Sequence, residues 1–459
     1  MQSSRTLTYS EDALRGPSQD RDPATIFPWD FRSWGRSLRT AGLPGLALQA
    51  LLIGTMLQLS DIGTTGPTHS STASLVLVRG PLALLALLLL LFRPRVAKVG
   101  MRDARLYFIL FGLLYLVSLL WSQEPAGTLG KSLEILLAGL ISLEISRYSN
   151  ALERVEALRR IILFTISALS VVTVVGYLLH ISAFVQQRPG LITRTTAQSP
   201  FLSGNGLGYV ASALFLVVFA DWQARRIATG SAMRQMAFAV ALFSLSASRT
   251  SFVILIFTVL LVIFRRSRVA AGLSALLLGV AGFALRQVLL SGLQGHQSTS
   301  DFTTLSGRTV LWSTALRQFK SYPLFGVGGG IGGKTVIKNI GNYYLQTVSS
   351  LHNGFLELLM GLGAIGLILG VYMLLLVTVR AWRAWRVHPE YSSTYVLIVH
   401  AWFTTIMSTG VLGWMGYEMA FFMVILTNVD LLRRQNMLRR APLRRPLFEH
   451  EPEAVMASD

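Results

Sequence analysis

The sequence contains no cysteine among its 459 residues. Neither a disulfide framework nor a thiolate metal site or nucleophile is therefore available. Charged residues are also scarce, at 14% of the chain, well below the roughly 25% of soluble globular domains. Histidine, aspartate and glutamate form no cluster with the spacing of a metal site, so we expect neither a metal ion nor another cofactor.

Apolar residues are abundant instead. They make up 52% of the chain, and the mean hydropathy is +0.53, values typical of proteins that cross a membrane many times. Segments long enough to cross about 30 Å of hydrocarbon as a helix predict an all-α polytopic membrane protein with about twelve transmembrane helices. They lie at residues 41–60, 74–92, 106–122, 131–146, 161–179, 201–221, 236–247, 251–264, 269–285, 354–377, 393–410 and 414–432. The seventh and eighth are short and should flank a turn.

These segments divide the chain into five parts. Residues 1–40 form a cytoplasmic tail, and residues 41–285 hold the first nine helices. Residues 286–351 form one long periplasmic loop with short helices, residues 352–432 hold the last three membrane helices, and residues 433–459 form a second cytoplasmic tail. The first 30 residues are polar and lack the apolar stretch of a removable signal peptide, so we expect them to be disordered.

Basic residues predict the orientation. With the N-terminus inside, 30 of the 41 Lys and Arg residues fall on one face, which the positive-inside rule makes cytoplasmic. Both termini are then cytoplasmic, and the net charge of +19 reflects topology rather than nucleic-acid binding. Because few carboxylates accompany the remaining cations, we expect an anionic ligand on the outer face. These cations are Arg79, Lys131, Arg188, Arg194, Arg249, Arg286, Arg308, Arg317, Lys320, Lys334 and Lys338.

Two of the outer arginines stand out by their position. Arg249 lies between two short apolar segments, where it is either an interfacial arginine that reaches water or a guanidinium that grips a phosphate bidentately. Arg308 opens a predicted amphipathic helix that runs to about Lys320. It is either a solvated side chain or an addition to the anion affinity of that helix N-terminus. Residues 323–330, rich in glycine, either let backbone approach a ligand or form an ordinary loop.

His352 lies where the long loop meets the tenth span. A histidine at such a boundary is either a structural hydrogen-bonding residue or a proton acceptor, since its ordinary pKa of about 6.5 suits neutral pH. Two carboxylates, Glu357 and Glu418, lie near the outer ends of the tenth and twelfth spans. Because buried carboxylates need partners, we expect them to pair with outer cations and orient them, with an acid or base role as the alternative.

Four motifs occur in order around the long loop. They are Ser203-Gly204-Asn205-Gly206-Leu207-Gly208 at the start of the sixth span, Ser248-Arg249-Thr250, Gly307-Arg308 with Trp312 and Pro323-Leu324-x-Gly326-x-Gly328, and Leu351-His352-Asn353-Gly354 with Gly363 and Gly366. On these motifs the chain, over residues 40–432, resembles the O-antigen ligase/polymerase superfamily. Within it, the chain is most similar to the exopolysaccharide polymerases of the ExoQ and Wzy type.

The resemblance implies a metal-independent, GT-C-like glycosyltransferase of the bacterial inner membrane. It would act on undecaprenyl-pyrophosphate-linked glycans at the periplasmic face. Arg249 and Arg308 would hold the donor pyrophosphate, and His352 would activate the acceptor hydroxyl, which would attack with inversion at the anomeric carbon. Further expected substrate-binding residues are Arg79, Lys131, Trp312, Asn353 and Glu418, of which Arg79 and Lys131 could contact a second pyrophosphate.

The leading interpretation is a polymerase that moves a growing glycan from its lipid pyrophosphate onto another lipid-linked repeat unit. A ligase that transfers a finished glycan to lipid A core or to a protein hydroxyl is the alternative within the same class. A transporter or flippase and a structural membrane protein are alternatives from other classes. The expected partners are the lipid-linked donor and acceptor and the bilayer, with a chain-length regulator and a flippase as further candidates and no nucleic acid.

Overall fold

The computed structural model describes residues 31–56, 100–188, 194–246, 248–267, 308–338, 350–408 and 416–434, with short pieces at 81, 84–85, 87–88, 269 and 272–276. The α-helices are α1 (Phe31–Ala41), α2 (Leu43–Met56), α5 (Ala104–Val117), α6 (Pro125–Ile145), α7 (Ala151–Leu178), α8 (Gly204–Gln223), α9 (Thr229–Ser246), α10 (Arg249–Arg266), α14 (Arg308–Phe319), α15 (Gly332–Lys338), α17 (Gly354–Val387), α18 (Ser392–Met407) and α20 (Tyr417–Arg434). Short 3-10 helices are η3 (Ser118–Trp121), η4 (Ser182–Phe184) and η5 (Pro389–Tyr391). One antiparallel hairpin, β1 (Val185–Arg188) with β2 (Arg194–Ala197), completes the described fold.

Five of these helical segments are long and apolar enough to cross a membrane. They are α5 with η3, α6, α7, α8 and α17, and two shorter apolar helices cover Leu43–Met56 and Thr250–Phe264. The architecture therefore fits an all-α membrane protein. The predicted number of twelve spans is not confirmed, because the second and ninth predicted spans lie mostly outside the described residues. The small β1–β2 hairpin was not predicted.

Helix α1 corrects the prediction that residues 1–40 are a tail. It begins at Phe31 and packs along α7, where the indole of Trp34 stacks on the ring of Phe164 with 5.2 Å between centroids. No long apolar segment marks this helix in the sequence, because arginines occupy its exposed face while the aromatic residues contact α7. An amphipathic helix of this kind is too polar as a whole to resemble a membrane span, although one of its faces is buried.

Helix α17 is broken at Gly363, which has φ 67° and ψ −163°. The N–H of Ala364 donates to the carbonyl of Pro323 at 2.9 Å, and the carbonyl of Met360 accepts from the N–H of Val327 at 2.9 Å. Backbone groups of the preceding loop thus replace the helical partners that the break removes. A side chain at Gly363 would lie 2.2 Å from the Leu324 carbonyl, so this close approach requires glycine.

One end of the bundle, which we call the charged end, buries two clusters of ion pairs. In the first, the fully buried Asp430 pairs with Arg105 at 3.2 Å and with Arg380. Asp103 pairs nearby with Arg433 and Arg434. This cluster joins the start of α5 to the ends of α17 and α20. Basic residues from segments far apart in the sequence therefore meet at one end of the molecule.

The second cluster at the charged end joins α7, α8 and Arg226 in the turn after α8. Arg159 lies between Asp221, at 3.0 Å, and Glu156, at 2.7 Å. Arg226 contacts the same two carboxylates at 3.3 and 3.1 Å. Each of these cations therefore has an acidic partner, which offsets the cost of removing it from water.

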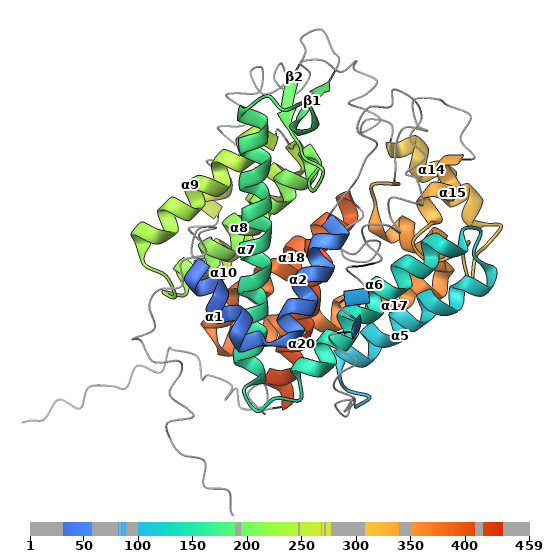
Figure 1. The fold of residues 1–459 in the computed structure, drawn as a ribbon, viewed down its shortest axis with the longest axis horizontal. Helices are drawn as coiled ribbons and strands as arrows, with labels where there is room; N and C mark the ends of the chain where they lie inside the picture. Colours follow the sequence, from blue (N-terminus) through green and yellow to red (C-terminus); the bar gives the residue numbers. More distant parts are fainter. Residues whose placement is uncertain are drawn as a thin grey trace, which may run out of the picture.

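The opposite end, which we call the site end, contains the starts of α8, α10, α14, α17 and α20 and the end of α18. Figure 1 shows α14, α15 and the β1–β2 hairpin toward this end and α1 toward the other. A separate apolar cluster fixes α14 and α15 on the first turns of α17. Its buried members are Leu311, Ala315, Val336, Ile337, Leu351 and Met360.

Candidate functional site

Asn353 determines where α17 begins. Its side-chain oxygen accepts hydrogen bonds from the N–H groups of Phe355 and Leu356, both at 3.1 Å. Asparagine is among the preferred residues for this N-cap position because it satisfies N–H groups that lack helical partners. The predicted substrate-binding residue Asn353 thus holds the helix start directly after His352.

His352 has a left-handed backbone conformation, with φ 50°. For residues other than glycine this conformation costs roughly 1–2 kcal/mol, so neighbouring contacts must maintain it. The adjacent residue, Leu351, provides them: its carbonyl accepts from the indole N–H of Trp312 at 2.9 Å, and its N–H donates to the carboxylate of Glu357 at 2.6 Å. Within the described part of the chain, the imidazole itself forms no hydrogen bond or ion pair and is half-buried.

Arg308 is the first residue of α14 and lies close to His352. Its guanidinium donates to the carbonyl of Met407, the last residue of α18, at 3.1 Å. Among the described residues it has no carboxylate partner. Burial, and secondly the charge of Arg308, lower the pKa of His352 to about 4. The imidazole is therefore neutral at pH 7 and able to accept a proton.

Tyr209 is a site residue that the sequence analysis did not identify. Its buried hydroxyl lies 3.5 Å from the Met407 carbonyl and within hydrogen-bonding reach of the Thr250 and Ser408 side chains. It is also close enough to Arg308 to interact with its charge. In the sequence, the feature that could have indicated Tyr209 as a site residue is its position directly after the glycine-rich motif at the start of α8.

The contact between Tyr209 and Thr250 places the start of α10 beside Tyr209, which also lies near Arg308. Arg249 is the first residue of α10, and its side chain lies outside the described part of the chain. The turn before α10 can approach α8 because Gly208 has no side chain: a Cβ there would lie 2.5 Å from that of Ser248. The first two motifs therefore pack directly against each other.

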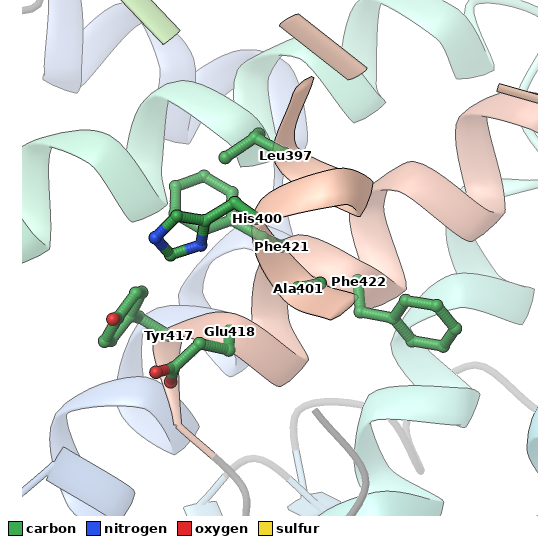
Figure 2. Close-up of a pocket in the computed structure, with 7 residues that line it drawn as sticks. All are labelled: Leu397, His400, Ala401, Tyr417, Glu418, Phe421 and Phe422. Carbon is green, nitrogen blue, oxygen red and sulfur yellow. The ribbon is translucent and has the colours of Figure 1, made fainter. Parts of the chain in front are cut away.

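Glu418 lines a small pocket between α18 and α20. Figure 2 shows its carboxylate and the Tyr417 hydroxyl from α20 near the imidazole of His400 from α18. The remaining lining residues are Leu397, Ala401, Phe421 and Phe422. His400 is hydrogen-bonded to Ser212 at 2.8 Å. Glu418 also interacts electrostatically with Tyr209, so this pocket borders the site without containing Arg308 or His352.

The glycine-rich loop packs against helices. The N–H of Gly328 donates to the carbonyl of Gly361 at 2.9 Å, and that of Gly329 to the hydroxyl of Ser118 at 2.9 Å. Lys131 packs against Gly330 and pairs with Glu134 at 3.4 Å. Lys131 is thus placed behind this loop and is not among the groups gathered around His352. Arg79 lies outside the described residues.

The structure thus brings Arg308, His352, Trp312 and Asn353 together at the start of α17, with the start of α10 linked through Tyr209. Among the described residues, no three His, Asp or Glu side chains come together as a group that could hold a metal ion. Comparison with known families gives one finding: residues 235–371 match the family model described as O-antigen ligase. That range covers all four of these residues and Arg249. No curated protein gives a match to the chain.

Proposed function

We propose that this chain, whose residues 235–371 match the family model described as O-antigen ligase, is a GT-C-like membrane glycosyltransferase. It polymerises undecaprenyl-pyrophosphate-linked repeat units into a polysaccharide. The observation that carries the proposal is that Arg308, which has no carboxylate partner among the described residues, lies near the neutral imidazole of His352. In this proposal both termini are cytoplasmic, about twelve helices span the bacterial inner membrane, and the site end faces the periplasm.

Arg308 and Arg249 act on the donor. When the bond between the anomeric carbon and the pyrophosphate oxygen breaks, negative charge develops on the leaving group. Guanidinium groups directed at that oxygen stabilise the transition state more than the ground state. Because these cations supply the positive charge, we expect the reaction to need no metal ion. Chelator treatment of the purified protein should leave its activity unchanged.

His352 acts on the acceptor. Its neutral imidazole takes the proton of the acceptor hydroxyl as the hydroxyl oxygen attacks the anomeric carbon on the face opposite the leaving group. One bond forms while one breaks, so the configuration inverts and the lipid pyrophosphate leaves. General-base help of this kind is worth about 10²- to 10⁴-fold in rate. Trp312, Asn353, Lys131, Arg79 and Glu418 are the further proposed contributors to substrate binding.

The lipid-linked glycans of a deletion strain test the proposal. A polymerase acts before chains are long, so its loss should leave single repeat units on undecaprenyl pyrophosphate. A ligase, the second candidate because the matched family is described as O-antigen ligase, would instead leave full-length lipid-linked chains. Lipid-linked glycans that appear on the periplasmic face only in the presence of this protein, without a new glycosidic bond, would contradict both and favour a flippase.

A further inference from the structure

The backbone of Leu351 is held from both sides. Its N–H donates to Glu357 at 2.6 Å, and its carbonyl accepts from the Trp312 indole at 2.9 Å. The side chain of Leu351 is fully buried in the apolar cluster between α14, α15 and α17. The peptide group that leads into His352 therefore has little freedom to rotate.

Glu357 also fixes a second element. Its other carboxylate oxygen accepts from the N–H of Gly333 at 2.8 Å, in the first turn of α15. A Cβ at Gly333 would lie 2.2 Å from the Glu357 carboxylate, so only glycine lets the two approach. Among the described residues Glu357 forms no ion pair with an arginine, and of the outer cations Lys334 interacts with it electrostatically. Both of its oxygens are used on backbone N–H groups.

We propose that Glu357 and Trp312 are positioning residues that hold His352 in its left-handed conformation and so direct its imidazole toward the acceptor. We call the contacts of Leu351 with these two residues the Leu351 clamp. The role of His352 rests on the proposed function, whereas the clamp itself is a property of the backbone. In the clamp Trp312 acts through its indole N–H, whereas its ring face is the part of the same residue that is proposed to contact substrate.

The clamp has a specific kinetic consequence. A general base must lie about 3 Å from the proton it removes, and a displacement of about 1 Å can cost on the order of 10²-fold in rate. Without the clamp, residue 352 can relax to a negative φ and move the imidazole. Arg308 is held by the Met407 carbonyl and not by the clamp. Loss of the clamp should therefore lower kcat about 10²-fold and leave the KM for donor nearly unchanged.

Three variants break the clamp from different sides. Glu357→Gln keeps the size of the side chain but replaces one accepting oxygen with a donor group. Gly333→Ala displaces the carboxylate without changing it, and Trp312→Phe keeps an aromatic face while removing the N–H donor. Gly230→Ala is the matched control, because a Cβ at Gly230 meets nothing within 4 Å.

The first measurement needs no activity. Hydrogen exchange in a peptide covering residues 350–354 should be slow in the wild type and in Gly230→Ala, and at least about 10-fold faster in Glu357→Gln and Gly333→Ala. The second measurement is kcat and KM for the same proteins, after gel filtration shows that each is folded. We expect kcat to fall in all three clamp variants.

Slow exchange with wild-type kcat in both Glu357→Gln and Gly333→Ala would overturn the clamp. Trp312→Phe keeps the ring face, so a rise in donor KM with unchanged kcat would also contradict the clamp, since that result would assign the N–H to substrate rather than to Leu351. If no preparation, including the wild type, transfers glycan, the proposed function fails. In that case the exchange rates alone decide whether the clamp exists.

Discussion

Arginines have different kinds of partner at the two ends of the helical bundle. At the charged end, Arg105, Arg159 and Arg380 each contact a buried aspartate. At the site end, Arg308 contacts only a backbone carbonyl among the described groups. An arginine paired with a carboxylate has its charge offset within the protein, whereas one held by a carbonyl keeps a full unit of charge for a ligand. The contrast separates arginines that hold the fold from Arg308, whose charge no carboxylate among the described residues offsets.

The pKa values of groups at the two ends show the same contrast. Burial raises the pKa of Asp103, but hydrogen bonds from Arg434 and from the Gly100 N–H outweigh it, so the pKa falls to about 2. At the site end, burial and Arg308 lower the pKa of His352 to about 4. The surroundings of Asp103 thus stabilise its charged form, whereas those of His352 destabilise its charged form. These surroundings suit a base that acts next to an anionic substrate. The imidazole of His352 is neutral, and the neighbouring Arg308 has no carboxylate partner among the described residues.

Removal of the Arg308 guanidinium should produce the largest effect. In Arg308→Ala we expect a loss of about 10³-fold or more in activity, because the charge that stabilises the leaving group is gone. The free energy of unfolding should change by less than about 1 kcal/mol, since no ion pair is broken. Initial rates with lipid-linked donor, together with thermal unfolding in detergent, measure the two quantities.

Arg317 provides the matched control for Arg308 on the same helix. Its side chain is exposed and bonded to Thr314 at 3.1 Å, so Arg317→Ala should keep nearly wild-type activity. Equal activity of Arg308→Ala and Arg317→Ala would remove Arg308 from the donor site.

The second effect concerns stability at the charged end. Asp430→Ala leaves Arg105 and Arg380 buried without their shared carboxylate, and the loss of one partner of such a group typically costs about 3–5 kcal/mol. We expect a lowered unfolding temperature in detergent. Glu124→Ala is the control, because its partner Lys338 is 61% exposed and exposed pairs contribute about 0–1 kcal/mol. If the two variants unfold at the same temperature, the clusters do not stabilise the fold.

The third effect is a difference between two pH profiles. His352 is a base only above its pKa, so the acid limb of kcat/KM, which reports the free enzyme, should lie well below pH 6.5. Bound pyrophosphate offsets the charge of Arg308, so the limb of kcat should lie at higher pH. Because the folded pKa lies below the unfolded value, His352 also costs stability as pH falls from about 6.5 toward 4. Coincident limbs near pH 6.5 would contradict this account.

Arg308 and His352 could be singled out from the sequence alone, because one opens a predicted helix in the long loop and the other lies where that loop meets a span. The helix α14, which the structure confirms at Arg308–Phe319, was also predicted from the sequence, by its position between Ser306-Gly307 and Pro323. These features depend on residue type and local order. The family match at residues 235–371 supports the resemblance to the superfamily, and it covers the last three of the four motifs.

Features that depend on packing between distant segments could not be predicted. The partners of Glu357 are backbone N–H groups, which every residue except proline possesses, so no side-chain pattern marks them. The break at Gly363 requires the distant loop that begins at Pro323. Tyr209 lies inside an apolar helix, and nothing in the sequence marks a partner for its hydroxyl. The partners come from α10 and from the end of α18, which only the fold places beside it.

The smallest effect tests whether Tyr209 links the parts of the site end. Tyr209→Phe removes only the hydroxyl shared by the Met407 carbonyl, Thr250 and Ser408. Arg308 keeps its own bond to that carbonyl, so we expect a loss of about 10-fold, consistent with roughly 1–1.5 kcal/mol for one hydrogen bond. The change should appear mainly in the KM for donor, because the start of α10 and its Arg249 would be less firmly held.

Tyr322→Phe is the control for this variant, since Tyr322 is 46% exposed in the nearby loop and should tolerate the change. A fall in kcat with unchanged donor KM in Tyr209→Phe would place the hydroxyl with the base rather than with the cations. Wild-type kinetics would instead mean that α10 and α14 reach the donor independently, and the contrast between the two ends would then rest on Arg308 alone.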